Sequence, residues 1–215
     1  MDKKQKFVIT INRELGSGGR TVGRKLAEKL GVPYYDKLLI QSLQEKYNIS
    51  AEDIEHEKGR KHPWITELLN AFITVNKSKD ELWYYQMTNE EPGDMVTSEE
   101  MFKTEQQILT NAAEEKSCVI AGRAGFYIFA NHPNHLSIMI QAPMEQRIER
   151  VMKKQNLSRE DAEKAIKHVD KMRENYVKNY TGSSRYDTHN YDLVISMNGK
   201  SEDEIVDMIL QFIGE

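Results

Sequence analysis

Cysteine is nearly absent from this sequence, which has Cys118 as its single thiol among 215 residues. A lone cysteine cannot form an intrachain disulfide, and it cannot supply the several thiolates of a structural zinc site. Cys118 lies in an apolar run, which is typical of an inert buried thiol. The charged N-terminus leads into too short an apolar run for a secretion signal. These features favour a reducing, cytoplasmic compartment.

The sequence also lacks long apolar runs and an excess of positive charge. No stretch approaches the ~18 apolar residues that a membrane-spanning helix needs. The formal net charge is −4, whereas sequence-independent binding of nucleic acid favours a net basic surface. The six histidines are scattered without the spacing of a metal motif. We therefore expect neither a membrane nor a nucleic acid as a partner.

Alternating apolar patterns predict an α/β fold in one domain over residues 1–215. Short β-branched or apolar runs predict strands that are buried on both faces, at residues 7–11, 32–35, 118–121, 136–140 and 192–196. Periodic patterns and capping residues predict helices between them, at about 20–30, 97–116, 143–155, 158–180 and from 201 onward. This alternation is typical of a parallel sheet with helices on both faces.

Residues 37–116 are predicted to be mostly helical, and 48–96 are the natural candidate for an insertion. We expect this insertion to lie over the edge of the sheet where the strands end. It contains both tryptophans, Trp64 and Trp83, among its aromatic residues. These side chains could form a dimer face or cover a pocket, so a homo-oligomer remains open.

A glycine-rich stretch at Gly16–Thr21 follows the first predicted strand and opens the first helix. Such a turn aims several backbone N–H groups at one point, where the helix dipole adds about half a positive charge. Glycine lets the backbone curl around a phosphate. The pattern favours binding of a nucleoside triphosphate such as ATP, and a turn without a ligand is the alternative. The predicted phosphate-binding residues are Gly16, Ser17, Gly18, Gly19, Arg20 and Thr21.

The stretch departs twice from a standard P-loop, which reads G-x-x-x-x-G-K-S/T. Arg13 stands at the first glycine, and Gly19 stands at the lysine. Some kinase loops carry one extra residue before the threonine, and that alignment makes Thr21 the hydroxyl beside Mg²⁺. Arg20 or Arg13 could supply the missing positive charge, because an arginine can bridge phosphate oxygens with its fork of donors.

Several blocks of the sequence together resemble the cytidylate kinase-like family, a relative of the bacterial CMP kinases among the P-loop nucleoside monophosphate kinases. The resemblance covers nearly the whole chain outside about 48–96. It implies a three-layer P-loop kinase fold with a five-stranded parallel sheet, a mobile acceptor-binding section, and a mobile lid at about 156–190. The matching blocks are Arg13–Arg20, Leu26–Lys37, Ala121–Arg123, Asp170–Tyr176, Tyr180–Gly182 and Asn190–Leu193.

The resemblance also implies roles for residues near the acceptor. Gly122–Arg123 resembles a G-R-D motif whose arginine grips the acceptor phosphate, although Ala124 stands in place of the aspartate. Asp170 and Arg173 resemble the D-x-x-R of the lid, in which the aspartate meets the sugar and the arginine meets phosphate. The CMP kinases carry another lid arginine where this chain has Ile166.

The residues themselves support a site at the edge where the strands end. Arg123 follows a buried strand there and could bind a ligand or pair with a nearby carboxylate. Asp36 ends the second strand and could orient the acceptor, hold Mg²⁺ through water, or cap the helix predicted from Lys37. Arg147 and Arg150 could face the triphosphate or lie on a solvated basic face.

The predicted lid helix has a polar and aromatic stripe. Asp170, Arg173, Tyr176 and Tyr180 follow each other at helical spacing, which places them on one face. Such a stripe suits a phosphorylated sugar, and an exposed ion pair beside core tyrosines is the alternative.

These features predict phosphoryl transfer from ATP to a small phosphorylated acceptor, such as CMP. Positioning and charge neutralisation do most of the catalysis in such enzymes. Arg20 or Arg13 would act with Arg173 on the transferred group, and Thr21 would help to hold Mg²⁺. One alternative is a non-catalytic nucleotide or phospho-ligand binding protein. Another is a kinase of a non-nucleotide molecule, which Ala124 and the aromatic insertion slightly favour.

Overall fold

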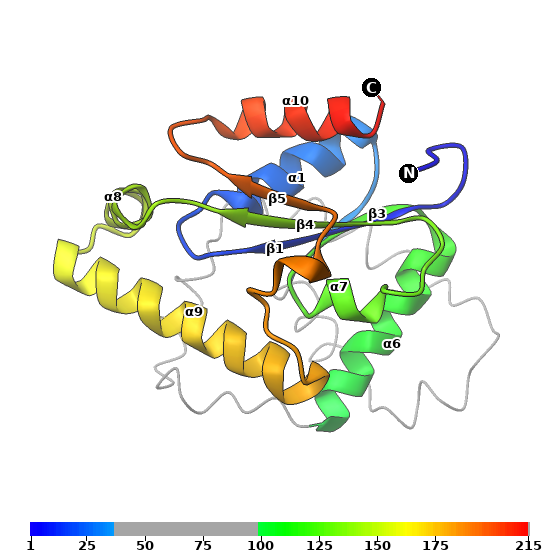
Figure 1. The fold of residues 1–215 in the computed structure, drawn as a ribbon, viewed down its shortest axis with the longest axis horizontal. Helices are drawn as coiled ribbons and strands as arrows, with labels where there is room; N and C mark the ends of the chain where they lie inside the picture. The colour runs from blue at the N-terminus through cyan, green and yellow to red at the C-terminus, as the bar shows by residue number, and fades with distance from the viewer. Residues whose placement is uncertain (37–98, 215) are drawn as a thin grey trace.

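The structure, a computed structural model, describes residues 1–36 and 99–214 (Figure 1). The described residues form one sheet of five parallel strands, in the order β2-β3-β1-β4-β5. The predicted parallel sheet is therefore confirmed. The predicted insertion at 48–96 and the predicted helix from Lys37 lie outside the described residues.

Apart from two short elements, α7 and η1, the described helices and strands follow each other in the order that the sequence pattern predicts. The strands are β1 (Val8–Arg13), β2 (Tyr34–Asp36), β3 (Cys118–Ala121), β4 (His135–Gln141) and β5 (Leu193–Ser196). The described helices are α1 (Gly19–Leu30), α6 (Glu99–Glu115), α7 (Gly125–Ile128), α8 (Met144–Gln155), α9 (Arg159–Thr181) and α10 (Glu202–Phe212), with a 3₁₀ turn η1 (Thr188–Asn190). In these parts of the chain, no helix is both long and apolar enough to cross a bilayer.

The middle strand β1 is buried on both faces, which explains its run of β-branched residues. Its residues pair with β3 on one side and β4 on the other, so that Val8 lies between Cys118 and His135. Cys118 is fully buried, and this burial raises the pKa of its thiol to about 12. The thiol is therefore inert at neutral pH, as predicted.

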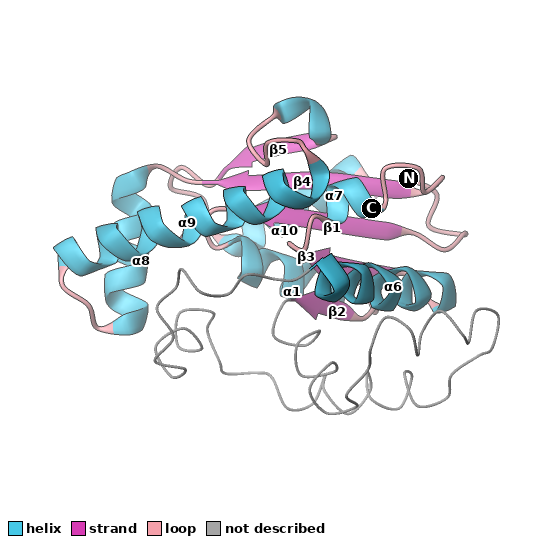
Figure 2. Cartoon of the chain, turned by 90° about the horizontal axis from the view of Figure 1, so that it is seen from below, coloured by secondary structure: helices cyan, strands magenta, loops and turns pink. Residues whose placement is uncertain are grey.

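Helices cover the sheet on both faces (Figures 1 and 2). On one face α1 and α10 pack against the strands, with Leu26 and Ile209 in the apolar core. On the other face α6 packs against the sheet, with Leu109 and Ile120 in a second core. Long α9 runs along this second side and packs against α8.

Local sequence signals set several of the helix ends. The Ser158 hydroxyl accepts a hydrogen bond of 3.1 Å from the Asp161 N–H at the start of α9. At α10, Ser201 and Glu204 form the predicted capping box. Short α7 is not predicted by the sequence pattern. It follows Arg123 and Ala124, whose φ angles of 53° and 52° are unusual for residues with a side chain.

The packing of α10 gives the first prediction. Ile209 is fully buried, whereas its neighbour Met208 is 45% exposed. Ile209→Ala should lower the free energy of unfolding by about 2–5 kcal/mol, because it removes buried methyl groups and leaves a cavity. Met208→Ala should change it by less than about 0.5 kcal/mol. Urea denaturation measures both, and equal losses would show that α10 does not pack as described.

Candidate active site

Charged side chains lie at the ends of β1, β2 and β3. The register places Ile11, Ala121 and Asp36 in one row across these strands. Arg13 ends β1, and the turn Gly122–Arg123 follows β3 directly. The sequence-predicted residues Arg13, Asp36 and Arg123 therefore lie at the same edge of the sheet.

The loop between β1 and α1 has the backbone of a phosphate cradle. Gly16 and Gly18 have φ angles of 80° and 85°, which residues with a side chain rarely adopt. A Cβ atom on Gly16 would lie 2.7 Å from the Arg147 carbonyl oxygen, so glycine is also needed for space. Ser17 is buried, and its hydroxyl accepts a bond of 3.3 Å from the Gly19 N–H. The loop therefore runs directly into the N-terminus of α1, where backbone N–H groups and the positive end of the helix dipole lie together.

The side chain of Arg13 explains why the lysine position holds a glycine. A Cβ atom on Gly19 would lie 2.6 Å from Cβ of Arg13 and 3.2 Å from Cβ of Ile140. Further along, the Arg13 guanidinium lies directly against Gly122. The arginine thus runs from the end of β1, past Gly19, to the turn after β3, and it is only 5% exposed. The two departures from a standard P-loop, Arg13 and Gly19, are therefore linked, because the arginine side chain fills the space beside the glycine.

Arg20 and Asp36 form an ion pair between α1 and β2. The Arg20 Nε and Nη2 atoms lie 3.0 Å and 2.9 Å from Oδ2 of Asp36. The Asp36 side chain is only 7% exposed and that of Arg20 is 23% exposed. Thr21 follows in the first turn of α1 and is half-buried. Asp36 thus has a partner that the sequence reasoning did not consider.

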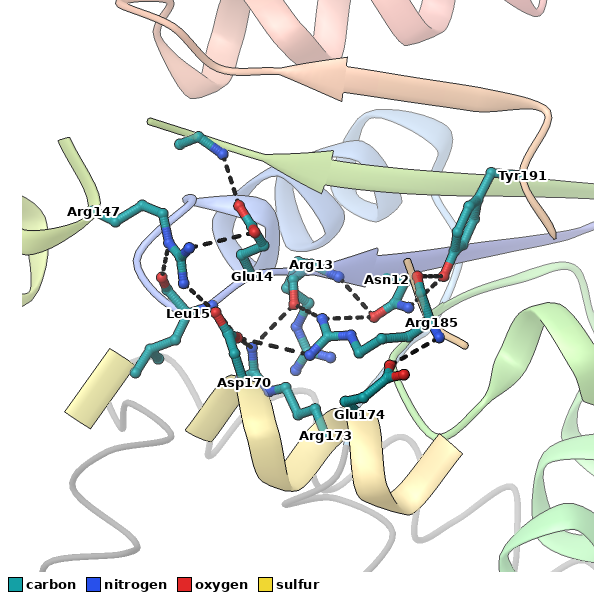
Figure 3. A network of polar contacts seen from close by, with 11 residues as sticks. Asn12, Arg13, Glu14, Leu15, Arg147, Asp170, Arg173, Glu174, Arg185 and Tyr191 are labelled. Atoms are coloured by element: carbon teal, nitrogen blue, oxygen red, sulfur yellow. Dashed lines mark hydrogen bonds and ion pairs between the residues drawn. The ribbon is translucent and has the colours of Figure 1, made fainter. Parts of the chain in front are cut away.

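The carboxylate of Asp170 fastens α9 to the phosphate loop (Figure 3). Its Oδ1 atom accepts a hydrogen bond of 2.9 Å from the Leu15 N–H. Its Oδ2 atom accepts a bond from Arg147. Arg173 and Arg185 form longer ion pairs with Oδ1, at 3.6 Å and 3.7 Å. One buried carboxylate therefore joins the loop to three arginines.

Arg147 holds the loop backbone and does not lie on a solvated basic face. Its Nε donates a hydrogen bond of 2.8 Å to the Leu15 carbonyl oxygen. Its Nη1 lies 3.3 Å from Oε1 of Glu14, and its side chain is buried. Arg150, one turn along α8, pairs instead with Glu202. These two arginines of α8 therefore support the loop and α10.

The predicted stripe on α9 divides into two parts. Arg173 points to the loop, where its Nη1 donates a bond of 3.0 Å to the Arg13 carbonyl oxygen. Tyr180 stacks on Phe102 of α6, with ring centroids 4.6 Å apart. Ile166, at the position of the further lid arginine, is fully buried in the apolar core between α8 and α9. The polar half of the stripe thus faces the loop, and the aromatic half packs on α6.

Arg123 lies in a buried cluster with Glu105 and Tyr176. It forms an ion pair with Glu105, and its Cζ atom lies 4.7 Å from the centroid of the Tyr176 ring. The Tyr176 hydroxyl donates a hydrogen bond of 2.8 Å to Oε2 of Glu105, and burial raises its pKa. Arg123 thus pairs with a nearby carboxylate, which is one of the two roles that the sequence left open for it.

Sequence reasoning missed two residues of this region, Glu105 and Arg185. Glu105 is fully buried and lies between Phe102 and Leu109 on the apolar face of α6. A charged residue within that helical pattern was a signal that could have found it. Arg185 is also fully buried, but it lies in an irregular segment where no periodicity marks it.

Comparisons of the sequence agree on one family of kinases. The model of the cytidylate kinase-like family matches residues 8–199. A cytidylate kinase of Methanopyrus kandleri is 25% identical over 206 residues, which cover 92% of this chain and 88% of that protein. A cytidylate kinase of Pyrococcus horikoshii is 26% identical over 194 residues, covering 90% of this chain and 81% of that protein.

Solved structures confirm the fold. An uncharacterized protein from Eubacterium ventriosum superposes with a TM-score of 0.63 at 26% identity, covering 96% of this chain and 98% of that one. A shikimate kinase from Bacteroides thetaiotaomicron reaches 0.50 at 12% identity, covering 97% and 99%. The second similarity concerns the fold alone, and it agrees with the predicted P-loop kinase architecture.

The contacts of Asp170 give the second prediction. Asp170→Asn should lower the free energy of unfolding by about 3–5 kcal/mol, because it leaves buried guanidinium groups without their counter-charge. Asp207→Asn should change it little, since Asp207 pairs with Lys29 at the exposed surface. Urea denaturation at low salt measures both. Similar small losses in the two variants would contradict the assignment of Asp170 as the anchor.

Proposed function

Because the chain belongs to the cytidylate kinase-like family and is a nucleoside monophosphate kinase-like phosphotransferase, we propose that it moves a phosphoryl group from ATP to a nucleoside monophosphate such as CMP. The observation that carries this proposal is the placement of Arg13 between Gly19 and Gly122. That placement puts a buried cation between the phosphate cradle and the turn that bears Arg123.

The donor side would be formed by residues Gly16–Thr21. The left-handed glycines and the start of α1 suit the oxygens of a β-phosphate. The half-buried Thr21 could hold Mg²⁺ through its hydroxyl, and Asp36 could reach the ion through water. When bound, Mg²⁺ neutralises charge on the phosphate oxygens. Arg20 would act mainly through Asp36, with which it is paired.

Arg13 is the better candidate for the missing lysine. Its stem fills the space beside Gly19, and its guanidinium lies against Gly122, so this cation starts from the end of β1 instead of from α1. Arg173 donates to the Arg13 carbonyl oxygen and therefore lies beside it. Two guanidinium groups in a buried site can offset the charge that spreads over a transferring phosphoryl group. We assign Arg13 and Arg173 this catalytic role.

The acceptor side would be formed around Arg123. Glu105 and Tyr176 hold its guanidinium in place, and an arginine has five N–H donors, enough to bind a phosphate as well. Asp170 is engaged with the loop and its arginines, so we assign it the positioning of α9 instead of a sugar contact. With α9 in this position, the lid would keep water from the triphosphate.

A kinase of a non-nucleotide acceptor is a second candidate, and Ala124 favours it. Its methyl group is buried in an apolar cluster with Phe102, Phe126 and Val177. A carboxylate at this position would need a polar partner in that cluster. The acceptor pocket near Arg123 is therefore less polar than the G-R-D motif would make it.

The third prediction tests the reaction itself. The full chain, with ATP and Mg²⁺, should release ADP faster when CMP is added. The increase in rate should be smaller with AMP, GMP or UMP. A coupled assay of ADP measures the release, and a reaction without acceptor gives the background. Binding of ATP without acceptor-dependent ADP release, for these four nucleotides and for non-nucleotide phosphates, would favour a non-catalytic binding protein.

The fourth prediction concerns Arg13. Arg13→Met keeps most of the buried volume but removes the cation, and it should lower kcat about 100-fold or more. Arg24→Met, which changes an exposed arginine on α1, should leave kcat within about two-fold. Thermal denaturation checks that both variants fold. A folded Arg13→Met enzyme with nearly normal kcat would show that the cation comes from elsewhere.

A further inference from the structure

Arg185 has a buried position that the proposed function does not use. It lies in the segment between α9 and η1, and its side chain is fully buried. Its Nη2 donates a hydrogen bond of 3.0 Å to Oδ1 of Asn12 and another to the Arg13 carbonyl oxygen (Figure 3). The guanidinium therefore sits where β1 passes into the phosphate loop.

The segment that carries Arg185 is fixed by bonds that do not involve the guanidinium. The Arg185 N–H donates a bond of 3.0 Å to Oε2 of Glu174 on α9. The Arg185 carbonyl oxygen accepts a bond of 2.6 Å from the Tyr191 hydroxyl, and that hydroxyl also accepts a bond from the Asn12 side chain. These bonds attach the segment without the guanidinium. Attachment of the segment therefore does not explain why the Arg185 side chain is buried.

In the part of the chain that the structure describes, two nitrogen atoms of the Arg185 guanidinium are left without a hydrogen bond. Within residues 1–36 and 99–214, its Nε and Nη1 atoms have no hydrogen-bond acceptor. Oδ1 of Asp170 lies 3.7 Å from its Nη1, and Arg147 and Arg173 share that carboxylate. Burial and the neighbouring charges of Arg173 and Arg13 lower the pKa of Arg185 to about 10. A fully buried guanidinium with two unbonded nitrogen atoms calls for an anion.

We propose that Arg185 binds oxygens of a substrate phosphate at the start of the loop, together with Arg13 and Arg173. Figure 3 shows the three side chains converging beside Asp170. A phosphate accepts several charge-assisted bonds from such groups, and Nε with Nη1 presents them as a fork. This inference rests on the proposed function and adds a third arginine to its phosphate site. The phosphate could belong to the donor or to the acceptor, and the binding experiment separates the two.

The fifth prediction compares Arg185→Met with the wild type. Without ligand, the variant should have a melting temperature equal to or above that of the wild type, because an unbalanced buried charge is removed. Inorganic pyrophosphate should raise the melting temperature of the wild type and much less that of the variant. Calorimetric titration should show at least about ten-fold weaker binding of a non-hydrolysable ATP analogue if the donor is contacted, or of CMP if the acceptor is contacted.

Two further variants make the result decisive. Arg159→Met changes an exposed arginine of α9 and should bind both ligands as the wild type does. Arg185→Lys keeps the charge without the fork, and it replaces Arg185→Met if that variant fails to fold. Weaker binding by folded Arg185→Lys supports the proposal. Unchanged binding by either folded variant, or failure of both to fold, would overturn it in favour of a purely structural role.

The same measurements separate this inference from the proposed reaction. If no acceptor stimulates ADP release but pyrophosphate stabilises the wild type through Arg185, the reaction is wrong and the phosphate site stands. If neither pyrophosphate, the ATP analogue nor CMP binds the wild type, the role of Arg185 is overturned whatever the activity.

Discussion

The carboxylate of Asp170 is the contact on which the phosphate-binding edge depends. It accepts the Leu15 N–H and attracts guanidinium groups from α8, from α9 and from the segment before β5. Ionic contacts in a buried site are strong, and losing one partner leaves the others unbalanced. The single carboxylate therefore sets the distance of α9 from the loop, and with it the place of Arg173.

The phosphate loop and the end of β1 fit each other through one packing contact, between Gly19 and Arg13. A lysine at residue 19 would compete with the Arg13 stem for the same space, since even a Cβ atom there comes within 2.6 Å of it. The arginine starts from a strand with both faces buried, and its carbonyl oxygen is bonded to Arg173 and Arg185. The arginine is thus held at a buried strand end, which is an advantage where catalysis depends on positioning.

Local patterns predicted most of the fold but only part of the site. The run at Cys118–Ala121 became β3 with the same bounds, and Ser158 and Ser201 cap the predicted helices. Arg13, Asp36 and Arg123 could be placed because parallel strands end at one edge. Arg185 could not, since its partner Asn12 is 173 residues away in a contact that no local period encodes. For Arg147 the sequence left a role at the triphosphate and a solvated face as alternatives, and its bonds to Leu15 and Asp170 are contacts that the helical pattern does not encode.

The two sides of the edge differ in how their charges are balanced. Arg123 has Glu105 as its own buried carboxylate, and the Tyr176 hydroxyl shares that partner. Arg147, Arg173 and Arg185 share Asp170 beside Arg13, with Glu14 as a further partner of Arg147 alone. On the proposed function, the side on which several arginines gather around Asp170 would meet the highly charged triphosphate. The side of Arg123 and Glu105 would meet an acceptor with a single phosphate, where selectivity must come from the surrounding apolar and aromatic side chains.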